Sequence, residues 1–402
     1  MADHENLKAA LRPCPVCDYA EATVLDTQRF ILPENHPLGT GYDVVCCSSC
    51  GFAYADTAAS QADYDRFYAS HSKYQDARTS TGSGLTAWDA ERLRETAGQI
   101  ARFEGNRDAR IVDIGCANGG LLAELQVQGF STLCGLDPSE ACARHTRLLP
   151  EVEAWEGGLS KIPVEAGRFD GIVLSHVLEH VRDLQSALAE VRRFLQPGGW
   201  VYAETPDAMR YAEFIPSPFQ DFNTEHINHF STTSMNNLLR SCEFEPVNCG
   251  TKTILSAPDM PYPALFVYAR MAQASDERQS DQALRESLRE YIRLSRQLLA
   301  RMNDNLALAL RGYDRIVVWG TGQLTLKLLT ESALSSIPIT QFIDSNPANQ
   351  GRTLRGAPII APGDLQDRTV PILVASTINA PSIREDIRRL NLPNPTITLS
   401  TH

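Results

Sequence analysis

The stretch ARIVDIGCANGGLLAELQVQGFSTLCGLDPSEAC, residues 109–142, decides the fold. Residues 110–114 predict a buried strand that ends at Gly115. The segment GGLLAEL then predicts the start of a helix, and STLCGLD predicts a second strand that ends in Asp137. In this strand, loop, helix and strand order, the glycines let a ligand approach the backbone, and the terminal carboxylate can bind ribose hydroxyls. The predicted fold class is therefore α/β with a Rossmann-like sheet.

The spacing of the glycines separates two kinds of nucleotide site. A dinucleotide site requires GxGxxG, so that a pyrophosphate can lie at the helix N-terminus. This loop instead has Gly115, Gly119 and Gly120, with Asp113 two residues before the first of them. The run FDGIVLSHVLEHVRDLQSALAEVRRFLQPGGWVYAETP, residues 169–206, predicts a strand, a loop, a helix, a PGG turn and a further strand. Together these stretches resemble the class I S-adenosylmethionine-dependent methyltransferases, and a dehydrogenase is the less favoured alternative.

This resemblance implies that S-adenosylmethionine is the cofactor, with its methionine moiety in the glycine loop and its ribose on Asp137. The segment GGLSKIP, residues 157–163, follows the third strand, where such enzymes place the adenine. The LEHV tetrapeptide implies that His180 lies at the cofactor edge of the active site, whereas His176 either shares that face or has a structural role. The cofactor-binding residues implied in this way are Asp113, Gly115, Ala117, Asn118, Gly119, Asp137, Pro138, Gly158, Leu159, Ser175 and His176.

The N-terminal cysteines form a second motif. CPVC at 14–17 and CSSC at 47–50 can each turn two thiolates toward one point, and two such turns complete a tetrahedral zinc site. The paired spacing favours zinc over the alternative of four buried thiols without a metal. Four thiolates leave no open coordination position, so the predicted Zn²⁺ is structural. Its ligands are Cys14, Cys17, Cys47 and Cys50, and the segment resembles a zinc ribbon.

Length and composition restrict the possible functions. A chain of 402 residues predicts two or three domains. The formal net charge of −12 argues against a nucleic-acid partner, because such proteins need a basic face. No apolar run approaches the roughly 18–20 residues that cross a bilayer, and the polar N-terminus does not resemble a signal peptide. The sequence therefore predicts a cytoplasmic protein without a membrane partner, and it sets no oligomeric state.

A second glycine turn occurs near the C-terminus. WGTG at 319–322 follows a predicted strand, and the next predicted strand ends at Asp344. Position 325 is threonine where GxGxxG has its third glycine, so we expect no second dinucleotide cofactor. This half is expected to shape a cleft and hold part of the acceptor. The expected domains are a zinc-binding ribbon and connecting helix (1–75), the cofactor-binding methyltransferase domain (76–272), a helical linker (273–312) and a Rossmann-like α/β domain (313–402).

The order of these parts carries a closer resemblance. CPVC and CSSC, DIGCANGG, LEHV, the EH pair of TEHINHFS (224–231) and the WGTG to FIDSNP unit resemble three-domain sugar C-methyltransferases over nearly the full chain. Those enzymes act on nucleotide-linked keto-deoxysugars. In that family the EH pair lies over the sugar and its histidine is the proposed base. The resemblance therefore implies a small-molecule, nucleotide-sugar acceptor, and catalytic roles for Glu225, His226, His180 and a pocket tyrosine, Tyr68 or Tyr74.

The chemistry of C-methylation is compatible with these residue types. A keto group acidifies the neighbouring C–H, and a histidine of near-neutral pKa can remove that proton while a carboxylate fixes its tautomer. The enolate then needs a donor, either a tyrosine hydroxyl or His180. Two enzymatic alternatives stay open: O-methylation of a sugar, and methylation of a non-sugar natural-product intermediate. A zinc-ribbon interaction protein with a degenerate methyltransferase domain is disfavoured by the intact Asp113, glycine loop and Asp137.

Overall fold

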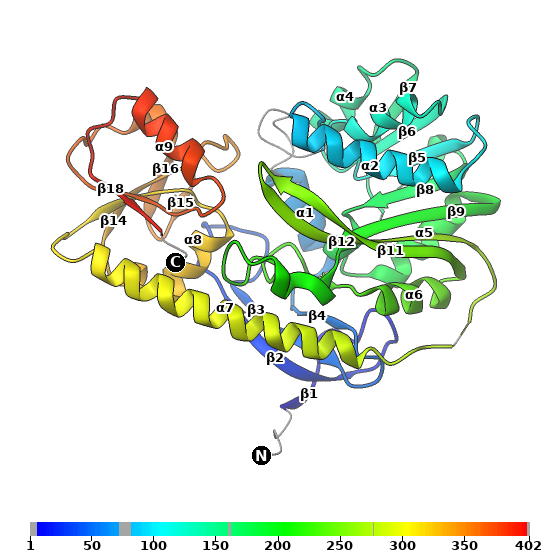
Figure 1. Cartoon of the computed structure of the whole chain (residues 1–402), viewed down its shortest axis with the longest axis horizontal. Helices are drawn as coiled ribbons and strands as arrows, with labels where there is room; N and C mark the ends of the chain where they lie inside the picture. Colours follow the sequence, from blue (N-terminus) through cyan, green and yellow to red (C-terminus); the bar gives the residue numbers. More distant parts are fainter. Residues whose placement is uncertain (1–5, 72–81, 160–161, 276, 400–402) are drawn as a thin grey trace. The chain divides into compact units, whose positions relative to one another are not determined.

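The computed structural model of the chain describes residues 6–71, 82–159, 162–275 and 277–399 (Figure 1). Tyr74, one of the two predicted pocket tyrosines, lies outside the described residues. The chain folds into two compact units, each built from segments that are distant in the sequence. The first unit comprises residues up to Leu25, Val44–Phe214 and Glu225–Leu288, and the second comprises Asp26–Asp43, Ile215–Thr224 and the residues from Arg289 onward.

A seven-stranded mixed sheet forms the centre of the first unit, with the strand order β11-β12-β9-β8-β5-β6-β7. The parallel strands are β5 (Arg110–Ile114), β6 (Thr132–Asp137), β7 (Val152–Glu156), β8 (Phe169–Ser175) and β9 (Leu195–Pro206). Strand β12 (Met260–Met271) is antiparallel to both β9 and β11 (Phe244–Ala257). Because β6 and β8 flank β5 on opposite sides, the carboxyl ends of β5 and β8 form the topological switch point where such sheets bind ligands.

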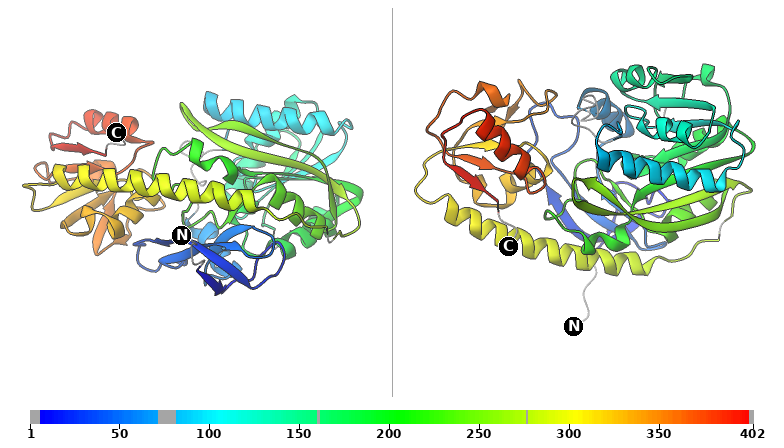
Figure 2. Two further views of the ribbon diagram at one scale, coloured as in Figure 1. Left: turned by 60° about the horizontal axis from the view of Figure 1, so that its bottom comes forward. Right: turned by 45° about the horizontal axis from the view of Figure 1, so that its top comes forward.

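Helices cover both faces of this sheet, because neighbouring residues of a strand point to opposite faces. In β5, Ile111 packs in a cluster with α2 (Ala87–Phe103) and α3 (Gly120–Val127). Val112 packs on the other face, in a cluster that contains α5 (Leu184–Phe194) and α6 (Thr232–Ser241). Figures 1 and 2 show α2 alongside the strands. The expectation of an α/β Rossmann-like methyltransferase fold is confirmed.

The remaining short elements of the first unit lie between these strands and helices. They are α1 (Gln61–His71), α4 (Glu140–Thr146), and the 3₁₀ turns η2 (Val164–Ala166), η3 (Leu178–His180) and η4 (Ala208–Glu213). The PGG motif does not form a separate turn before β9 but lies inside it. Gly198 has φ +79°, and the pairing of β8 with β9 is irregular between Phe169 and Gly171. The glycines therefore allow a bulge in the strand where the sequence predicted a break.

An N-terminal sheet has the strand order β1-β2-β3-β4-β10. Its strands are β1 (Leu7–Ala9), β2 (Glu21–Arg29), β3 (Gly41–Cys47), β4 (Ala53–Asp56) and β10 (Asn228–His229). The last of these comes from the TEHINHFS segment and pairs antiparallel with β4, so that Asn228 lies opposite Tyr54 and His229 opposite Ala53. The segment that contains the predicted catalytic pair therefore completes the sheet that carries the cysteines.

A six-stranded sheet lies in the second unit, with the strand order β15-β16-β14-β13-β17-β18. Its parallel strands are β13 (Ile316–Trp319), β14 (Ile339–Ile343), β16 (Ala357–Ile360), β17 (Ile372–Val374) and β18 (Thr396–Thr398), and β15 (Thr353–Leu354) is antiparallel to β16. The chain reaches this sheet through the long helix α7 (Gln282–Ala309). The other elements are α8 (Gln323–Glu331), η5 (Ala333–Ser335), η6 (Pro362–Asp364) and α9 (Ala380–Arg389). Within the described ranges, no helix is both long and apolar enough to cross a membrane.

Candidate active site

The glycine loop after β5 lies at the switch point and is fixed by hydrogen bonds to the end of β6. Gly115 has φ +78°, and Gly119 has φ +81° at the N-cap of α3, a conformation that favours glycine. The Ala117 amide donates to Asp137 Oδ2 at 2.9 Å. Ala117 has φ +46°, and such strain in a non-glycine residue clusters at ligand sites. Of the other predicted cofactor residues, Asn118 and Leu159 are buried, while Pro138 and Gly158 are half-buried near the ends of β6 and β7.

Two buried carboxyl groups face this loop with unusual acidities. Burial, and then the neighbouring Asp137, raise the pKa of Asp113 to about 8. Burial raises the pKa of Asp137 to about 6, although its carboxylate accepts the amides of Ala117 and Ser139. Asp113 Oδ1 has no hydrogen-bond partner among the described residues. A pair of desolvated carboxyl groups with an unused oxygen fits a ligand that carries positive charge and hydroxyl donors, as S-adenosylmethionine does.

His176 begins a network of buried charges at the end of β8. It has φ +57°, and its Nδ1 lies 3.2 Å from Glu179 Oε1 while its Nε2 lies 3.3 Å from Glu204 Oε1. Burial alone would lower the pKa of His176, but the two carboxylates raise it. Lys252 pairs with Glu204 at 2.8 Å, and together with His176 it lowers the pKa of that carboxyl despite its burial. Two carboxylates thus favour the protonated form of His176, against the effect of its burial.

The predicted catalytic residues meet beside this network. Tyr68 on α1 places its hydroxyl 2.8 Å from His180 Nδ1, and the Glu225 carbonyl oxygen lies 3.0 Å from the same nitrogen. The rings of His180 and His226 make an edge-to-face contact with centroids 4.8 Å apart. A carboxylate oxygen of Glu179 and one ring nitrogen each of His180 and His226 all lie within 4.8 Å of one another. Residues from α1, from the LEHV turn and from TEHINHFS therefore converge at one point.

The hydrogen bonds at His180 Nδ1 determine that this ring nitrogen carries a proton. The Glu225 carbonyl can only accept a hydrogen bond, so Nδ1 of His180 must carry the proton that it accepts. Tyr68 then accepts from the same N–H through its oxygen, which leaves the phenol proton to be donated to another acceptor. In the neutral form of such an imidazole the lone pair lies at Nε2, the nitrogen 3.9 Å from Glu179 Oε1.

Glu225, the other residue of the predicted pair, contacts His180 through its backbone: its carbonyl oxygen lies 3.0 Å from His180 Nδ1. The carboxylate that gathers with the two imidazoles belongs to Glu179, which is 1% exposed at its side chain. The LEHV motif contained this residue, but its alignment with His226 depends on a contact between segments distant in the sequence. The buried Glu204 and its half-buried partner Lys252 carried no signal in the sequence.

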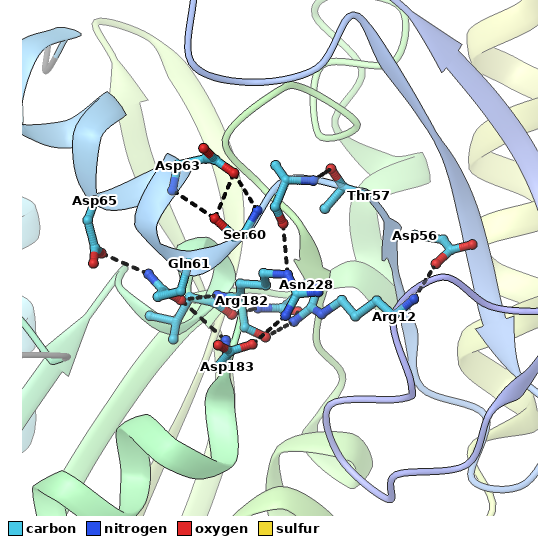
Figure 3. Close-up of polar contacts among 12 residues, drawn as sticks. Arg12, Asp56, Thr57, Ser60, Gln61, Asp63, Asp65, Arg182, Asp183 and Asn228 are labelled. Atoms are coloured by element: carbon cyan, nitrogen blue, oxygen red, sulfur yellow. Dashed lines mark hydrogen bonds and ion pairs between the residues drawn. The ribbon is translucent and has the colours of Figure 1, made fainter.

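Asn228 and His229 follow the pair and are buried. Asn228 Oδ1 accepts from Arg12, and its Nδ2 donates to the Leu178 and Val181 carbonyls (Figure 3). Burial lowers the pKa of His229 to about 3, so its imidazole is neutral at physiological pH. His229 lies edge-to-face to Tyr211. Both residues therefore have structural positions, unlike His226 beside them.

The four predicted zinc ligands gather at one point in the N-terminal segment. The sulfur atoms of Cys14, Cys17, Cys47 and Cys50 lie within 4.8 Å of one another, with 3.6 Å between Cys14 and Cys50 and 3.5 Å between Cys17 and Cys47. A zinc–thiolate bond of about 2.3 Å separates the corners of a tetrahedral site by about 3.8 Å. The thiol of Cys46 is directed to the Gly51 carbonyl instead. The donor set and spacing fit a tetrahedral Zn²⁺.

Each cysteine pair closes the same backbone turn. The Asp18 amide donates to the Cys14 carbonyl at 2.8 Å, and the Gly51 amide donates to the Cys47 carbonyl at 3.0 Å. Asp18 and Gly51, the residues after each second cysteine, have φ +59° and +80°. Both pairs are thus presented by equivalent turns, which supports a common ligand.

The fold and the loop define a class I S-adenosylmethionine-dependent methyltransferase domain, and comparisons with known proteins agree. Residues 88–248 match the family model described as a methyltransferase domain. The chain is 28% identical over 153 residues to a ubiquinone biosynthesis O-methyltransferase of Bordetella avium (strain 197N), covering 36% of this chain and 61% of that protein. It is 39% identical over 103 residues to an uncharacterized 37.1 kDa protein in transposon TN4556 of Streptomyces fradiae, covering 24% of this chain and 30% of that protein.

Among solved structures, a Burkholderia thailandensis 1,6-didemethyltoxoflavin-N1-methyltransferase with bound 1,6-didemethyltoxoflavin and S-adenosylhomocysteine is similar. The identity is 20% and the TM-score is 0.41, with 56% of this chain and 97% of that chain covered. The chain spans 61% and 30% of the lengths of the two curated relatives described above. The match to a methyltransferase domain is thus shown for residues 88–248 of this chain.

Proposed function

We propose that this chain methylates a nucleotide-linked keto-deoxysugar or a related glycan intermediate, and that the methyl group is transferred to carbon. The observation that supports this proposal is the convergence of Tyr68, His180 and His226 beside the end of β8, where the cofactor loop also lies. Two imidazoles and a phenol can remove a proton from carbon and stabilise the oxygen that receives the charge. The resemblance to sugar C-methyltransferases supports the sugar as the acceptor.

Each residue has a defined part in the proposed reaction. His226 removes the proton from the carbon beside the keto group. The electron pair of that C–H bond forms the C=C bond of an enolate, and the π pair of the carbonyl moves to its oxygen. Tyr68 donates its phenol proton in a hydrogen bond to this oxygen, while the His180 N–H holds the phenol oxygen in place. S-adenosylmethionine, when bound, supplies the methyl group that the enolate carbon takes. The carboxyl groups of Asp113 and Asp137 hold the cofactor.

The other parts of the chain complete the proposal. Cys14, Cys17, Cys47 and Cys50 would hold a structural Zn²⁺ that closes the N-terminal sheet, since four thiolates leave no position for a substrate. The division into a ribbon, a methyltransferase domain, a helical linker and a C-terminal domain stays part of this proposal.

O-methylation is the second candidate. The relative from Bordetella avium is named a ubiquinone biosynthesis O-methyltransferase, and its similarity covers 153 residues. His226 could deprotonate a hydroxyl as well as a carbon acid, because both steps need a base of near-neutral pKa. The same base therefore serves a sugar hydroxyl or a hydroxyl of a non-sugar intermediate.

The test combines binding with product analysis. Calorimetry with S-adenosylhomocysteine first establishes cofactor binding, and nucleoside diphosphates are then titrated to detect the nucleotide of the acceptor. A panel of nucleotide-linked keto-deoxysugars is incubated with S-adenosylmethionine, and mass spectrometry detects methylated product. Exchange of the sugar C–H in deuterated water, without S-adenosylmethionine, is expected for C-methylation. Methylation of a hydroxyl without such exchange would establish the O-methyl alternative, and cofactor binding without nucleotide binding would refute the sugar-nucleotide acceptor.

A further inference from the structure

Asn228 connects three segments of the first unit two residues after His226. Its backbone lies in β10, opposite Tyr54 of β4. Its side-chain amide donates to the carbonyl oxygens of Leu178 at 2.8 Å and Val181 at 2.7 Å. These carbonyls flank the two central residues of the LEHV turn, so one amide group determines how that turn meets the N-terminal sheet.

The backbone between the two histidines is fixed by the same contacts. The Ile227 amide donates to the Glu179 carbonyl at 2.8 Å, and the Ala55 amide donates to the Ile227 carbonyl at 2.9 Å. Ile227 follows His226 directly, and Glu179 precedes His180 directly. The relative position of the two imidazoles therefore depends on how the turn, β10 and β4 are held together.

Arg12 donates a hydrogen bond to the side-chain oxygen of Asn228. Its Nη2 donates to Asn228 Oδ1 at 3.0 Å and also to the carbonyl of Arg182 (Figure 3). The Arg12 amide donates to Asp56 Oδ1 at 2.9 Å, and its carbonyl accepts from the Tyr54 hydroxyl at 3.1 Å. Arg12 thus joins Asn228, at the edge of the N-terminal sheet, to Arg182, the residue after the LEHV turn.

The position of Arg12 is unfavourable for a charge. The residue is 2% exposed, and its Nε and Nη1 have no hydrogen-bond partner within the described part of the chain. An arginine guanidinium keeps its positive charge in proteins. A buried cation without a carboxylate partner costs stability, and an apolar side chain of similar volume is often at least as stable. A contribution to the stability of the fold therefore does not explain why an arginine occupies this buried position.

We propose that Arg12 and Asn228 form a clamp that positions His180 and His226 against each other. The N-terminal sheet then holds the catalytic geometry through this clamp, in addition to any structural role in folding. Both are positioning residues, because neither is placed to touch the reacting atoms. The inference rests on the catalytic roles proposed above for the two histidines.

The test uses two variants that break the clamp at different points. Asn228→Asp keeps the size and an acceptor for Arg12 but removes both hydrogen bonds to the Leu178 and Val181 carbonyls. Arg12→Met keeps those two bonds and the pairing of β10 with β4, but removes the guanidinium that binds Asn228 Oδ1 and the Arg182 carbonyl. The matched control is Lys8→Met, which removes an ion pair to Asp56, at 2.6 Å, in the same sheet.

The readout needs no acceptor. Imidazole nitrogen and carbon-bound proton signals are recorded by NMR on the full chain labelled with ¹⁵N-histidine, and single His→Gln variants assign them. In Arg12→Met and Asn228→Asp, the signals of His180 and His226 are expected to shift, whereas that of exposed His145 on α4 stays in place. Calorimetry should give an affinity for S-adenosylhomocysteine within about twofold of the wild type in all three variants.

Unchanged His180 and His226 signals in both clamp variants would overturn the proposal, as would the same shifts in Lys8→Met. A parallel loss of S-adenosylhomocysteine affinity would overturn it too, because the pair would then support the whole domain rather than the histidines. If Arg12→Met fails to fold, Asn228→Asp still decides the matter, since it retains the Arg12 contact. A failure to methylate sugars leaves these spectra unaffected, so the two proposals are tested separately.

Discussion

Two glycine turns in this chain, at residues 115–120 and 320–322, follow the same pattern. Each lies between a strand and a helix, and a second strand then leads to an aspartate. The two aspartates differ in what they bind. In the first, Asp137 accepts two backbone amides, and Asp113 beside it has an oxygen without a partner among the described residues. Burial raises the pKa of both carboxyl groups. Both acids are desolvated, and Asp113 has an oxygen left for a ligand, as expected where a ligand completes the site.

In the second turn the aspartate is already saturated. Asp344 Oδ2 accepts the amide and the hydroxyl of Thr321 and the side-chain amide of Asn349, while its Oδ1 accepts the Asn346 amide at 2.8 Å. Thr325, in the place of the third glycine, donates its hydroxyl to the Gly320 and Ala375 carbonyls. The comparison teaches that a glycine turn followed by an aspartate indicates a nucleotide site only when the protein leaves the carboxylate available.

The largest difference is expected from removing each aspartate's charge. Asp137→Asn should weaken S-adenosylhomocysteine binding by about 10- to 100-fold, since hydrogen bonds to a charged group contribute roughly 1.5–3 kcal/mol. Asp344→Asn should leave this affinity unchanged and instead lower the unfolding midpoint, because its carboxylate accepts bonds from within the protein. Calorimetry and thermal denaturation of both variants provide the measurement. Equal losses of affinity in both variants would remove the distinction between the two turns.

The two turns also differ in the space beside a glycine, Gly120 in the first turn and Gly322 in the second. A Cβ at Gly120 would lie 2.7 Å from Leu93 Cδ1 and 2.8 Å from the Gly82 carbonyl oxygen, whereas a Cβ at Gly322 meets nothing within 4 Å. Gly120→Ala should therefore lower the free energy of unfolding by about 1–3 kcal/mol through overpacking. Gly322→Ala should change it by no more than about 0.5 kcal/mol. Urea denaturation checks both values, and a larger loss in Gly322→Ala would contradict the packing described for the two turns.

The smallest expected effect concerns pH. Asp113, with a pKa of about 8 in the free protein, is mostly protonated at neutral pH. Binding of a cationic ligand lowers the pKa of Asp113, so a proton is released on binding. The affinity for S-adenosylmethionine therefore rises with pH, by at most about tenfold per pH unit. It levels off above the pKa that Asp113 has in the free protein. Calorimetry in buffers of different ionisation enthalpy measures the released proton. Asp113→Asn should abolish the release, whereas Asp344→Asn should retain it; release that persists in Asp113→Asn would assign the proton to another group.

The sequence was sufficient for the local parts of this description. The glycine loop, the acid after β6, LEHV and the EH pair each lie within a short segment whose residue types and spacing carry the information. It was not sufficient for contacts between distant segments. Nothing local to Arg12 indicates that it reaches Asn228, and nothing in β11 marks Lys252 as the partner of Glu204. The pairing of β10 with β4 was missed because two residues are too few to produce a strand pattern.

We propose that the cofactor binds at the first glycine turn and that His226 removes the proton. His226→Ala is compared with the wild type for S-adenosylhomocysteine affinity and for methyl transfer to the acceptor that the sugar panel identifies. We expect an unchanged affinity and a rate lower by about 10²- to 10⁴-fold, the usual contribution of a general base. A near-wild-type rate in His226→Ala would contradict the proposal.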